Sequence, residues 1–241
     1  GNAALLAAIH GHPRLLPSFV LGPLDCGEYG VASSLPQRLT ASGVRAIWLL
    51  PARHGWSLTG PEAGSLQDVL RRAGLPAFID LEETDWASID ALCSALPSVD
   101  VVVTGIGYRT LRQAFPVMDR RPRLHVDLSY LAALDGLELF VSRYGAGRVL
   151  LGTGAPVRDD AAPLFLLSRS GLSDEDRAMV AGGTAARLLE HPRFTFVEGD
   201  VAGLDGAEDE LPQRERVAVG ERAQAGRRHV VDLGPAGGRL E

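Results

Sequence analysis

Short apolar runs alternate with longer amphipathic stretches along most of this chain. The six clearest runs have the length and composition of buried strands and cover residues 18–24, 44–50, 76–82, 100–106, 124–129 and 148–154. Each run is continuously apolar, which indicates a strand that is covered on both faces. A strand-to-strand spacing of roughly 25–30 residues is typical of βα units in a parallel sheet. The pattern predicts an α/β fold, either an eight-stranded barrel or an open doubly wound sheet.

The stretches between these runs carry helix start and stop signals. Residues 65–76 predict a helix that ends at Gly74. Residues 84–97 begin at Thr84, the expected N-cap, and residues 134–148 contain a Tyr-Gly stop signal. No G-x-G-x-x-G motif follows the first predicted strand, which disfavours the nucleotide-binding type of open sheet.

The pattern weakens near the C-terminus. Residues 201–228 are rich in glycine, alanine and charge and have little periodicity, which is typical of a loop or a mobile tail. Two strand-like runs, 194–200 and 229–233, lie on either side of that stretch. We therefore expect a barrel domain over residues 1–190 and a partly mobile C-terminal extension over residues 191–241.

The net charge of the chain argues against some classes of binding partner. The sequence has 24 basic and 30 acidic residues, a formal net charge of −6, which argues against nucleic acid or an anionic membrane. No apolar run approaches the roughly 20 residues that span a bilayer, and the first residues do not resemble a signal peptide. Cys26 and Cys93 lie far apart and are expected to be free thiols. We therefore expect a cytoplasmic protein that binds neither nucleic acid nor membranes.

All 24 basic residues are arginine. The absence of lysine excludes Schiff-base catalysis, Walker-type phosphate binding and a metal site bridged by a modified lysine. The exclusion holds whatever causes the bias toward arginine, alanine and glycine.

Two stretches near the end of the predicted barrel resemble a known family. Residues 137–160 and 172–189 resemble the end of the barrel in the amidohydrolase superfamily, where the last strand reads apolar–Gly-Ser-Asp-x-Pro and a later helix reads Gly-Asn-Ala-x-Arg-Leu-Leu. The matching residues here are Gly152-Thr153-Gly154-Ala155-Pro156 and Gly183-Thr184-Ala185-Ala186-Arg187-Leu188-Leu189. The resemblance covers roughly residues 1–190. It implies a (β/α)8 barrel of the TIM-barrel type, of which this chain lacks the first two strands at its N-terminus.

The resemblance also implies a metal site at the strand ends, made of a His-x-His pair, two further histidines and an aspartate, which are ligands that zinc prefers. Transferred onto this sequence, the histidines become Asp80 and either Thr104 or Gly105, and the aspartate becomes Gly154. The His-x-His pair of the first strand has no counterpart, because His10 and His12 precede the first predicted strand in a helix-to-loop context. We expect a degenerate site without a cofactor, with zinc or another divalent metal as the alternative.

Polar side chains nevertheless gather after the predicted strands. The candidate catalytic residues are Asp80, His54 and Asp127, because carboxylates and imidazoles can transfer protons without a metal. Strand alternation places Glu82 on the face of Asp80 and Ser129 on the face of Asp127. The alternative to a functional role for each of these residues is a structural one at the rim, where the side chain pairs with an arginine or a helix N-terminus. His125 is expected to lie in the core. The candidate substrate-binding residues are Arg53, Glu82, Tyr108, Arg109 and Thr153.

We expect the predicted barrel to be closed, because open sheet edges expose unpaired backbone. The sequence is compatible with several ways of closing it. Residues 194–200 and 229–233 could add two strands, either within one chain or swapped into a partner chain. A separate chain could supply the strands instead, or the sequence lacks its N-terminal segment and the extension is unrelated. The expected partners are a small-molecule ligand and a homodimer or partner chain that completes the barrel.

Together these features predict an amidohydrolase-related protein that acts on a small polar or carboxylate-bearing compound, by hydrolysis or by a decarboxylation-type cleavage, with a degenerate metal site. The alternative is a non-catalytic barrel that binds a ligand or serves as a subunit of a complex. The loss of three ligand positions favours the alternative, whereas the retained glycine-rich strand end and polar rim favour an enzyme. The sequence does not separate a hydrolase from a lyase.

Overall fold

The computed structural model describes residues 2–13, 15–133, 135–155 and 161–189. It contains the six predicted strands, each shorter than its apolar run: β1 (Ser18–Leu21), β2 (Ala46–Leu49), β3 (Ala77–Asp80), β4 (Val101–Thr104), β5 (Leu124–Asp127) and β6 (Val149–Leu150). Every strand ends before its run does. The chain turns at glycines such as Gly105 (φ 77°) and Gly154 (φ 70°), where the left-handed backbone does not continue a strand. The runs at 194–200 and 229–233, and the extension as a whole, lie outside the described residues.

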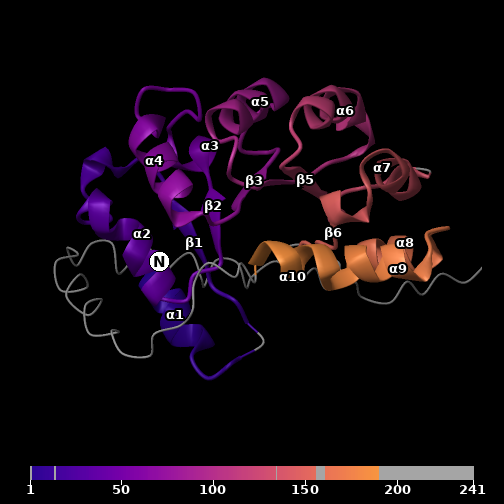
Figure 1. Ribbon diagram of the computed structural model, residues 1–241, viewed down its shortest axis with the longest axis horizontal. Helices are drawn as coiled ribbons and strands as arrows, with labels where there is room; N and C mark the ends of the chain where they lie inside the picture. The colour runs from indigo at the N-terminus through magenta and orange to yellow at the C-terminus, as the bar shows by residue number, and fades with distance from the viewer. Residues whose placement is uncertain (1, 14, 134, 156–160, 190–241) are drawn as a thin grey trace, which may run out of the picture. The chain divides into compact units, whose positions relative to one another are not determined.

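The sheet decides between the two predicted architectures. All six strands are parallel and neighbour one another in chain order, β1-β2-β3-β4-β5-β6 (Figure 1). A doubly wound sheet reverses its strand order at a switch point, whereas a βα barrel adds its strands in sequence. The open-sheet alternative is therefore wrong, and the chain has the α/β fold of a TIM-type barrel with six consecutive strands. Within the described ranges, β1 and β6 each pair with one neighbour and form the edges of the sheet.

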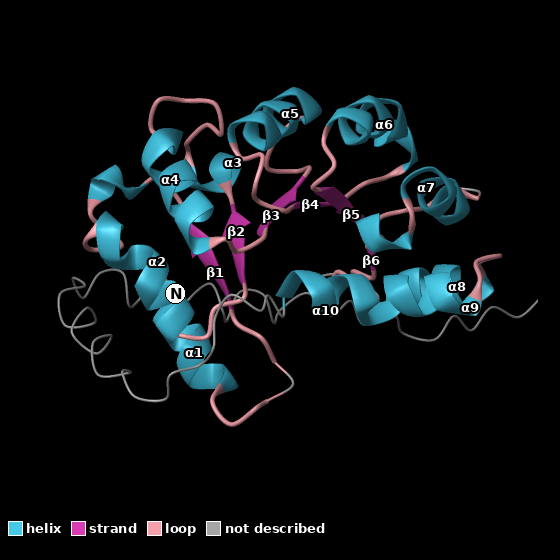
Figure 2. Ribbon diagram, in the orientation of Figure 1, coloured by secondary structure: helices cyan, strands magenta, loops and turns pink. Residues whose placement is uncertain are grey.

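Helices connect the strands (Figure 2). The helix expected over residues 65–76 ends at Gly74 as predicted, but α5 starts one residue later than predicted. Its N-cap is Asp85 rather than Thr84, because the Asp85 carboxylate accepts a hydrogen bond from the Ser88 backbone N–H at 2.8 Å. The helical segments are α1 (Asn2–Ile9), η1 (Leu24–Cys26), η2 (Ala32–Ser34), α2 (Leu35–Ala41), α3 (Pro51–His54), α4 (Ala63–Ala73), α5 (Trp86–Ala95), η3 (Tyr108–Thr110), α6 (Leu111–Arg120), α7 (Gly136–Tyr144), η4 (Ala146–Arg148), α8 (Ala161–Arg169), α9 (Asp174–Ala178), the π-helical η5 (Met179–Gly183) and α10 (Thr184–Leu189).

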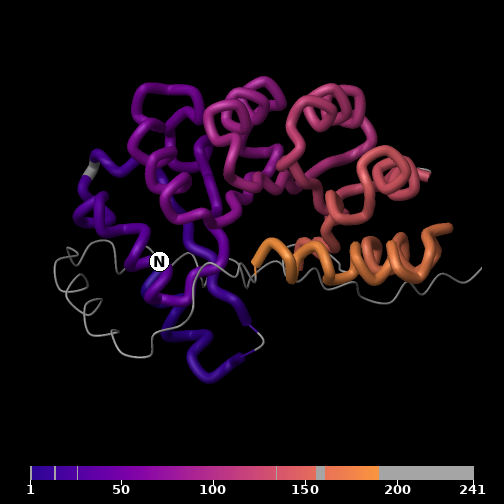
Figure 3. Tube along the Cα trace, viewed as in Figure 1, coloured from indigo at the N-terminus to yellow at the C-terminus, as the bar shows by residue number. Residues whose placement is uncertain are grey.

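Successive residues of each strand pack on opposite faces of the sheet. In β4, Val101 and Val103 belong to the main core beneath helices α2 and α4 to α7, whereas Val102 belongs to a second cluster with Leu150 and Leu188 of α10. Figures 1 and 3 show α4 to α7 on one side of the strands and α10 on the other. This alternation defines an outer face under the helices and an inner face that carries every second residue.

Some backbone groups at the two edges of the sheet form hydrogen bonds with residues outside the sheet. The side-chain amide of Asn2 donates to the Val20 carbonyl at 2.9 Å and accepts from the Val20 N–H at 3.1 Å, so it takes the place of a neighbouring strand on β1. After β6, the Leu151 N–H donates to the Val180 carbonyl in the π-helical turn at 3.0 Å. Such contacts satisfy edge groups that would otherwise be left unpaired.

Candidate functional site

A row of polar side chains lies on the inner face, at the carboxyl end of the sheet. Asp80 is the last residue of β3 and lies in register with Thr104, the last residue of β4. Asp127, the last residue of β5, is in the next position of the same row because Val103 pairs with Val126. Strands of a barrel deliver their functional side chains to this end. The three side chains therefore converge where barrel chemistry takes place.

Asp80 is held by donors on two sides. The Thr104 hydroxyl donates to Asp80 Oδ2 at 2.7 Å, and the Glu82 backbone N–H donates to Asp80 Oδ1 at 2.8 Å. Two residues earlier on the same face, Phe78 packs against Trp48 of β2, with ring centroids 5.4 Å apart. Both aromatic side chains are only partly buried. The carboxylate thus lies next to an apolar surface on the inner face.

Asp127 is the most perturbed carboxyl in this row. Its side chain is buried, and the Ser129 hydroxyl donates to Oδ1 at 2.8 Å. The pKa of Asp127 is raised to about 6, mainly by burial and to a lesser extent by the negative charge of Asp80, which together outweigh the hydrogen bonds from Ser129 and from the Gly105 backbone. Among the described residues, neither Asp80 nor Asp127 has an ion pair. The site is therefore a carboxylate pair without a compensating cation from those residues.

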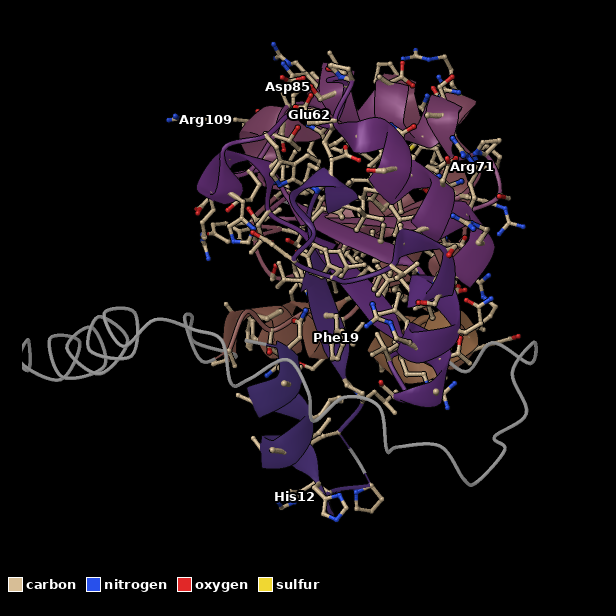
Figure 4. The ribbon with its side chains drawn as sticks, turned by 90° about the vertical axis from the view of Figure 1, so that its left-hand side faces the viewer. His12, Phe19, Glu62, Arg71, Asp85 and Arg109 are labelled. Carbon is tan, nitrogen blue, oxygen red and sulfur yellow. The ribbon has the colours of Figure 1, made fainter. Side chains whose placement is uncertain are left out.

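The other candidate residues lie around this pair at varying exposure. His54 is the exposed last residue of α3, and exposed Arg53 pairs with the buried Glu83, Nε to Oε1 at 3.4 Å. Tyr108 and Arg109 are exposed in η3, and the Arg109 side chain extends away from the ribbon in Figure 4.

Two more candidates lie in turns. The half-buried Thr153 accepts a hydrogen bond from the Ala155 N–H at 3.3 Å. Glu82 does not share a strand face with Asp80 as predicted, because β3 ends at Asp80 and Glu82 lies in the following turn. There its exposed carboxylate accepts from the Tyr130 hydroxyl at 3.4 Å.

Three contributors to the site were not among the predicted residues. Glu83 anchors the Arg53 backbone N–H at 2.9 Å, Tyr130 contacts Glu82, and Gly105 donates its N–H to Asp127. The Gly-x-Gly sequence at the end of the fourth apolar run, residues 105–107, could have indicated Gly105, because a bend there brings backbone close to neighbouring strand ends. No sequence pattern distinguishes Glu83 or Tyr130.

His125, His12 and Cys93 do not contribute to this carboxylate pair. His125 is buried and its Nε2 lies 2.9 Å from Asp100 Oδ1, so it is a core residue as predicted. His12 lies at the opposite end from Asp85 and Arg109 in Figure 4. Cys93 is a buried free thiol whose pKa is raised to about 12 by burial, which makes it a poor nucleophile.

A catalytic zinc normally has three protein ligands besides its water. The row offers two carboxylates, from Asp80 and Asp127, and two hydroxyls. No group of three or more histidine, cysteine, aspartate or glutamate side chains in the described part of the chain has a metal-binding arrangement. These residues therefore do not fit the metal site of the resemblance.

The parallel strand order and the polar row at the strand ends define a TIM-type barrel protein with its candidate site at the carboxyl end of the sheet. A family model described as amidohydrolase matches residues 2–190. The chain belongs to the amidohydrolase family, as the last strand and the helices after it predicted. No curated protein sequence matches this chain.

Solved structures share the fold. An uncharacterised TIM-barrel protein, Bb4693 from Bordetella bronchiseptica, has 19% identity and a TM-score of 0.62, covering 79% of this chain and 72% of that one. The 5-carboxyvanillate decarboxylase LigW2 from Novosphingobium aromaticivorans, with bound manganese, has 14% identity and a TM-score of 0.62, covering 79% and 69%. An amidohydrolase from Burkholderia multivorans, with bound zinc, has 16% identity and a TM-score of 0.58, covering 79% and 78%. At these identities the likeness establishes the fold alone.

In the ranges that the structure describes, no helix is long and apolar enough to cross a bilayer.

Proposed function

We propose that this amidohydrolase-family chain acts on a small polar or carboxylate-bearing compound by acid–base chemistry at the Asp80–Asp127 pair. The observation that carries the proposal is Asp127, a buried carboxyl with a pKa of about 6 beside a second carboxylate. Such a group is present in both protonation states near neutral pH, which suits a general acid or base. Two carboxyls in unlike environments are a recurring way to divide the acid and base roles.

The pair can serve either of the two predicted reactions. In a hydrolysis, Asp80 takes a proton from water as the water oxygen bonds to the substrate carbon, and protonated Asp127 gives its proton to the leaving group. In a decarboxylation, Asp127 protonates the carbon that keeps the electron pair when CO₂ leaves. The partly buried Trp48 and Phe78 offer an apolar surface to the body of the substrate. His54, Arg53, Tyr108 and Arg109, exposed after β2 and β4, are the proposed further substrate contacts.

We propose further that the metal site is degenerate in this chain. Two of the similar structures hold manganese or zinc. Here the positions that the resemblance assigns to ligands are occupied by Asp80, Thr104 or Gly105, and Gly154. One carboxylate among these positions is a weak donor set for a divalent metal.

A second candidate function is ligand binding without catalysis. The residues at the ligand positions favour this function, because only Asp80 offers a carboxylate there and the other positions carry a hydroxyl or no side-chain donor. In this function the carboxylate pair and the aromatic surface would recognise a small ligand, or the barrel would serve as a subunit of a complex.

The test is a substrate screen with purified protein, using carboxylated aromatic compounds and cyclic amides, with and without a chelator. We expect turnover that resists the chelator and falls as the pH rises through about 6, because protonated Asp127 is the acid. Asp127→Asn should lose this turnover, and the exposed Asp68→Asn should keep it as the matched control. Binding of a screened compound without turnover would support the second function. Stoichiometric zinc uptake with activity dependent on zinc would contradict the degenerate site.

A further inference from the structure

Two glycines meet the carboxylate pair at close range. A Cβ added at Gly152, just beyond β6, would collide with Asp127, 2.7 Å from its Cγ and closer still to Oδ2. A Cβ added at Gly105, just beyond β4, would lie 2.8 Å from Asp80 Oδ1 and 3.2 Å from its Cγ. Neither position can carry a side chain while the carboxylates stay where they are, because such separations are below van der Waals contact.

Gly74 and Gly171 do not have this property and serve as a comparison. Gly74 has a positive φ of 64°, like Gly105 at 77°, but a Cβ there would meet nothing within 4 Å. A Cβ at Gly171 would also be in open space. A Cβ at Gly60, Gly136 or Gly183 would also come closer than 3 Å to a side chain, that of Glu62, Ala133 or Met179. Gly105 and Gly152 differ from these glycines because the atoms they approach belong to the carboxylate pair.

Gly105 contacts both members of the pair. Its backbone N–H donates to the Asp127 carboxylate, and its Cα side faces Asp80 Oδ1. Asp80 is fixed on its other side by the Thr104 hydroxyl, and Asp127 by the Ser129 hydroxyl. The strand-end backbone of β4 thus lies between two carboxylates from β3 and β5.

Gly152 limits the position of Asp127 from the other side. Asp127 is only 8% exposed, and burial is the largest cause of its raised pKa. A methyl group at Gly152 would displace the carboxylate from this space, and we expect the displaced carboxylate to be more exposed. The depth of Asp127 therefore depends on the absence of a side chain at this glycine.

We propose that Gly105 and Gly152 are positioning residues of the carboxylate pair, and that the missing side chains at the ends of β4 and β6 set the burial of Asp127 and its approach to Asp80. The catalytic consequence rests on the proposed function, whereas the positioning itself concerns only the proton equilibrium of the pair. Changing either glycine should alter that equilibrium in a protein that remains folded.

The first experiment is a carboxyl ¹³C NMR titration of Asp127 in the full chain, comparing Gly152→Ala with Gly171→Ala. We expect Gly152→Ala to lower the proton affinity of Asp127 by about tenfold, because the carboxylate loses burial. Gly171→Ala should leave it unchanged. An Asp127 titration that is the same in Gly152→Ala as in the original protein would overturn the proposal.

The second experiment tests Gly105 with a residue that tolerates its backbone. Asparagine adopts positive φ more readily than most residues, so Gly105→Asn and Gly74→Asn differ mainly in what the new Cβ meets. We expect Gly105→Asn to change the titration of Asp80 or Asp127, and Gly74→Asn to change neither. Unchanged titrations in folded Gly105→Asn would remove Gly105 from the proposal.

A double-mutant comparison keeps the proposal testable if Gly152→Ala folds poorly. Asp127→Ala removes the group that the new methyl would strike. Gly152→Ala should therefore lower the thermal midpoint much less in the Asp127→Ala background than in the original chain, while Gly171→Ala has the same small effect in both. Equal losses in the two backgrounds would show that Gly152 is needed for another reason.

These readouts separate the inference from the function on which it builds. If the titrations shift as expected and no compound is turned over, the positioning stands and the proposed catalysis fails. If turnover depends on Asp127 but the titration of Asp127 is unchanged in the variants of both glycines, the proposed function stands and the positioning role fails.

Discussion

Two acids at opposite ends of the inner face, half-buried Asp100 and buried Asp127, have opposite surroundings. Asp100, directly before β4, contacts His125 at 2.9 Å and the Arg123 guanidinium at 3.0 Å. Burial would raise the pKa of Asp100, but the hydrogen bond and charge of His125, together with Arg123, bring it below its usual value. Asp127 at the end of β5 has hydroxyl and backbone donors, and its pKa is raised to about 6. The same residue type is thus stabilised as an anion at one end of the sheet and destabilised at the other.

The comparison shows which end of the sheet holds a group that lowers the stability of the fold. The amino-terminal end of the strands contributes to stability in TIM barrels, and the carboxyl end carries chemistry. A buried carboxylate without a cation lowers stability, and functional sites commonly keep such groups. Asp100 and Asp127 fit this pattern, because Asp100 lies at the end that contributes to stability and Asp127 at the end that carries chemistry.

The largest expected effect is a gain in stability from Asp127→Asn. The folded chain binds the Asp127 proton more tightly than the unfolded chain, so this group makes the fold less stable as the pH rises from about 4 to 6. At about pH 8 the variant should exceed the original in free energy of unfolding by about 3 kcal/mol, and below about pH 4 the difference should vanish. Urea denaturation across this range measures it. A variant that is less stable at the higher pH would contradict the uncompensated charge.

The same change at the other acid should have the opposite sign. Asp100→Asn weakens the contacts with His125 and Arg123, and at about pH 8 it should lower the free energy of unfolding by about 2 kcal/mol. Because the pKa of Asp100 is lowered in the fold, its contribution is complete above the ordinary aspartate value and is lost as the pH falls below it. The deficit should therefore shrink in acid, as urea denaturation would show. If Asp100→Asn stabilised the protein as Asp127→Asn does, the two ends would not differ as described.

Thr104→Val sharpens the comparison within the carboxyl end. Valine keeps the β-branched shape and removes the hydroxyl that donates to Asp80 at 2.7 Å. We expect a loss of about 1 kcal/mol in the free energy of unfolding and a change in the pH dependence of any turnover. Thr110→Val, at the last residue of η3 before α6, is the control for turnover, because its hydroxyl bonds local backbone of Gly107.

The smallest effect should come from Arg53→Gln at the rim. The Arg53 side chain is 69% exposed in its pair with Glu83, and such pairs contribute less than about 0.5 kcal/mol. The free energy of unfolding should be almost unchanged, while binding of a carboxylate-bearing compound should weaken if Arg53 contacts it. Calorimetric titration with the compounds found in the screen separates the two effects.

Much of the fold could be predicted because its signals are local. Apolar runs and their spacing located all six strands, and Gly74 marked the end of α4. The sequence predicts Thr84 as the N-cap of α5, but Asp85 caps it, because two adjacent polar residues can both cap and only the backbone geometry selects Asp85. Strand alternation predicts Glu82 on the face of Asp80, but β3 ends at Asp80 and the alternation ends with it. Periodicity does not show where a buried run leaves the sheet.

The order of the residues by itself determined the α/β class, the family resemblance and the absence of lysine chemistry, because these depend on composition and on patterns within one segment. Only the tertiary structure decided that the strands follow one another in a single parallel sheet. It also brought Asp80, Thr104 and Asp127 from three strands into one row, with Gly105 and Gly152 against the carboxylates. The pKa of Asp127 follows from this assembly, because burial and the charge of a residue from another strand act only across space.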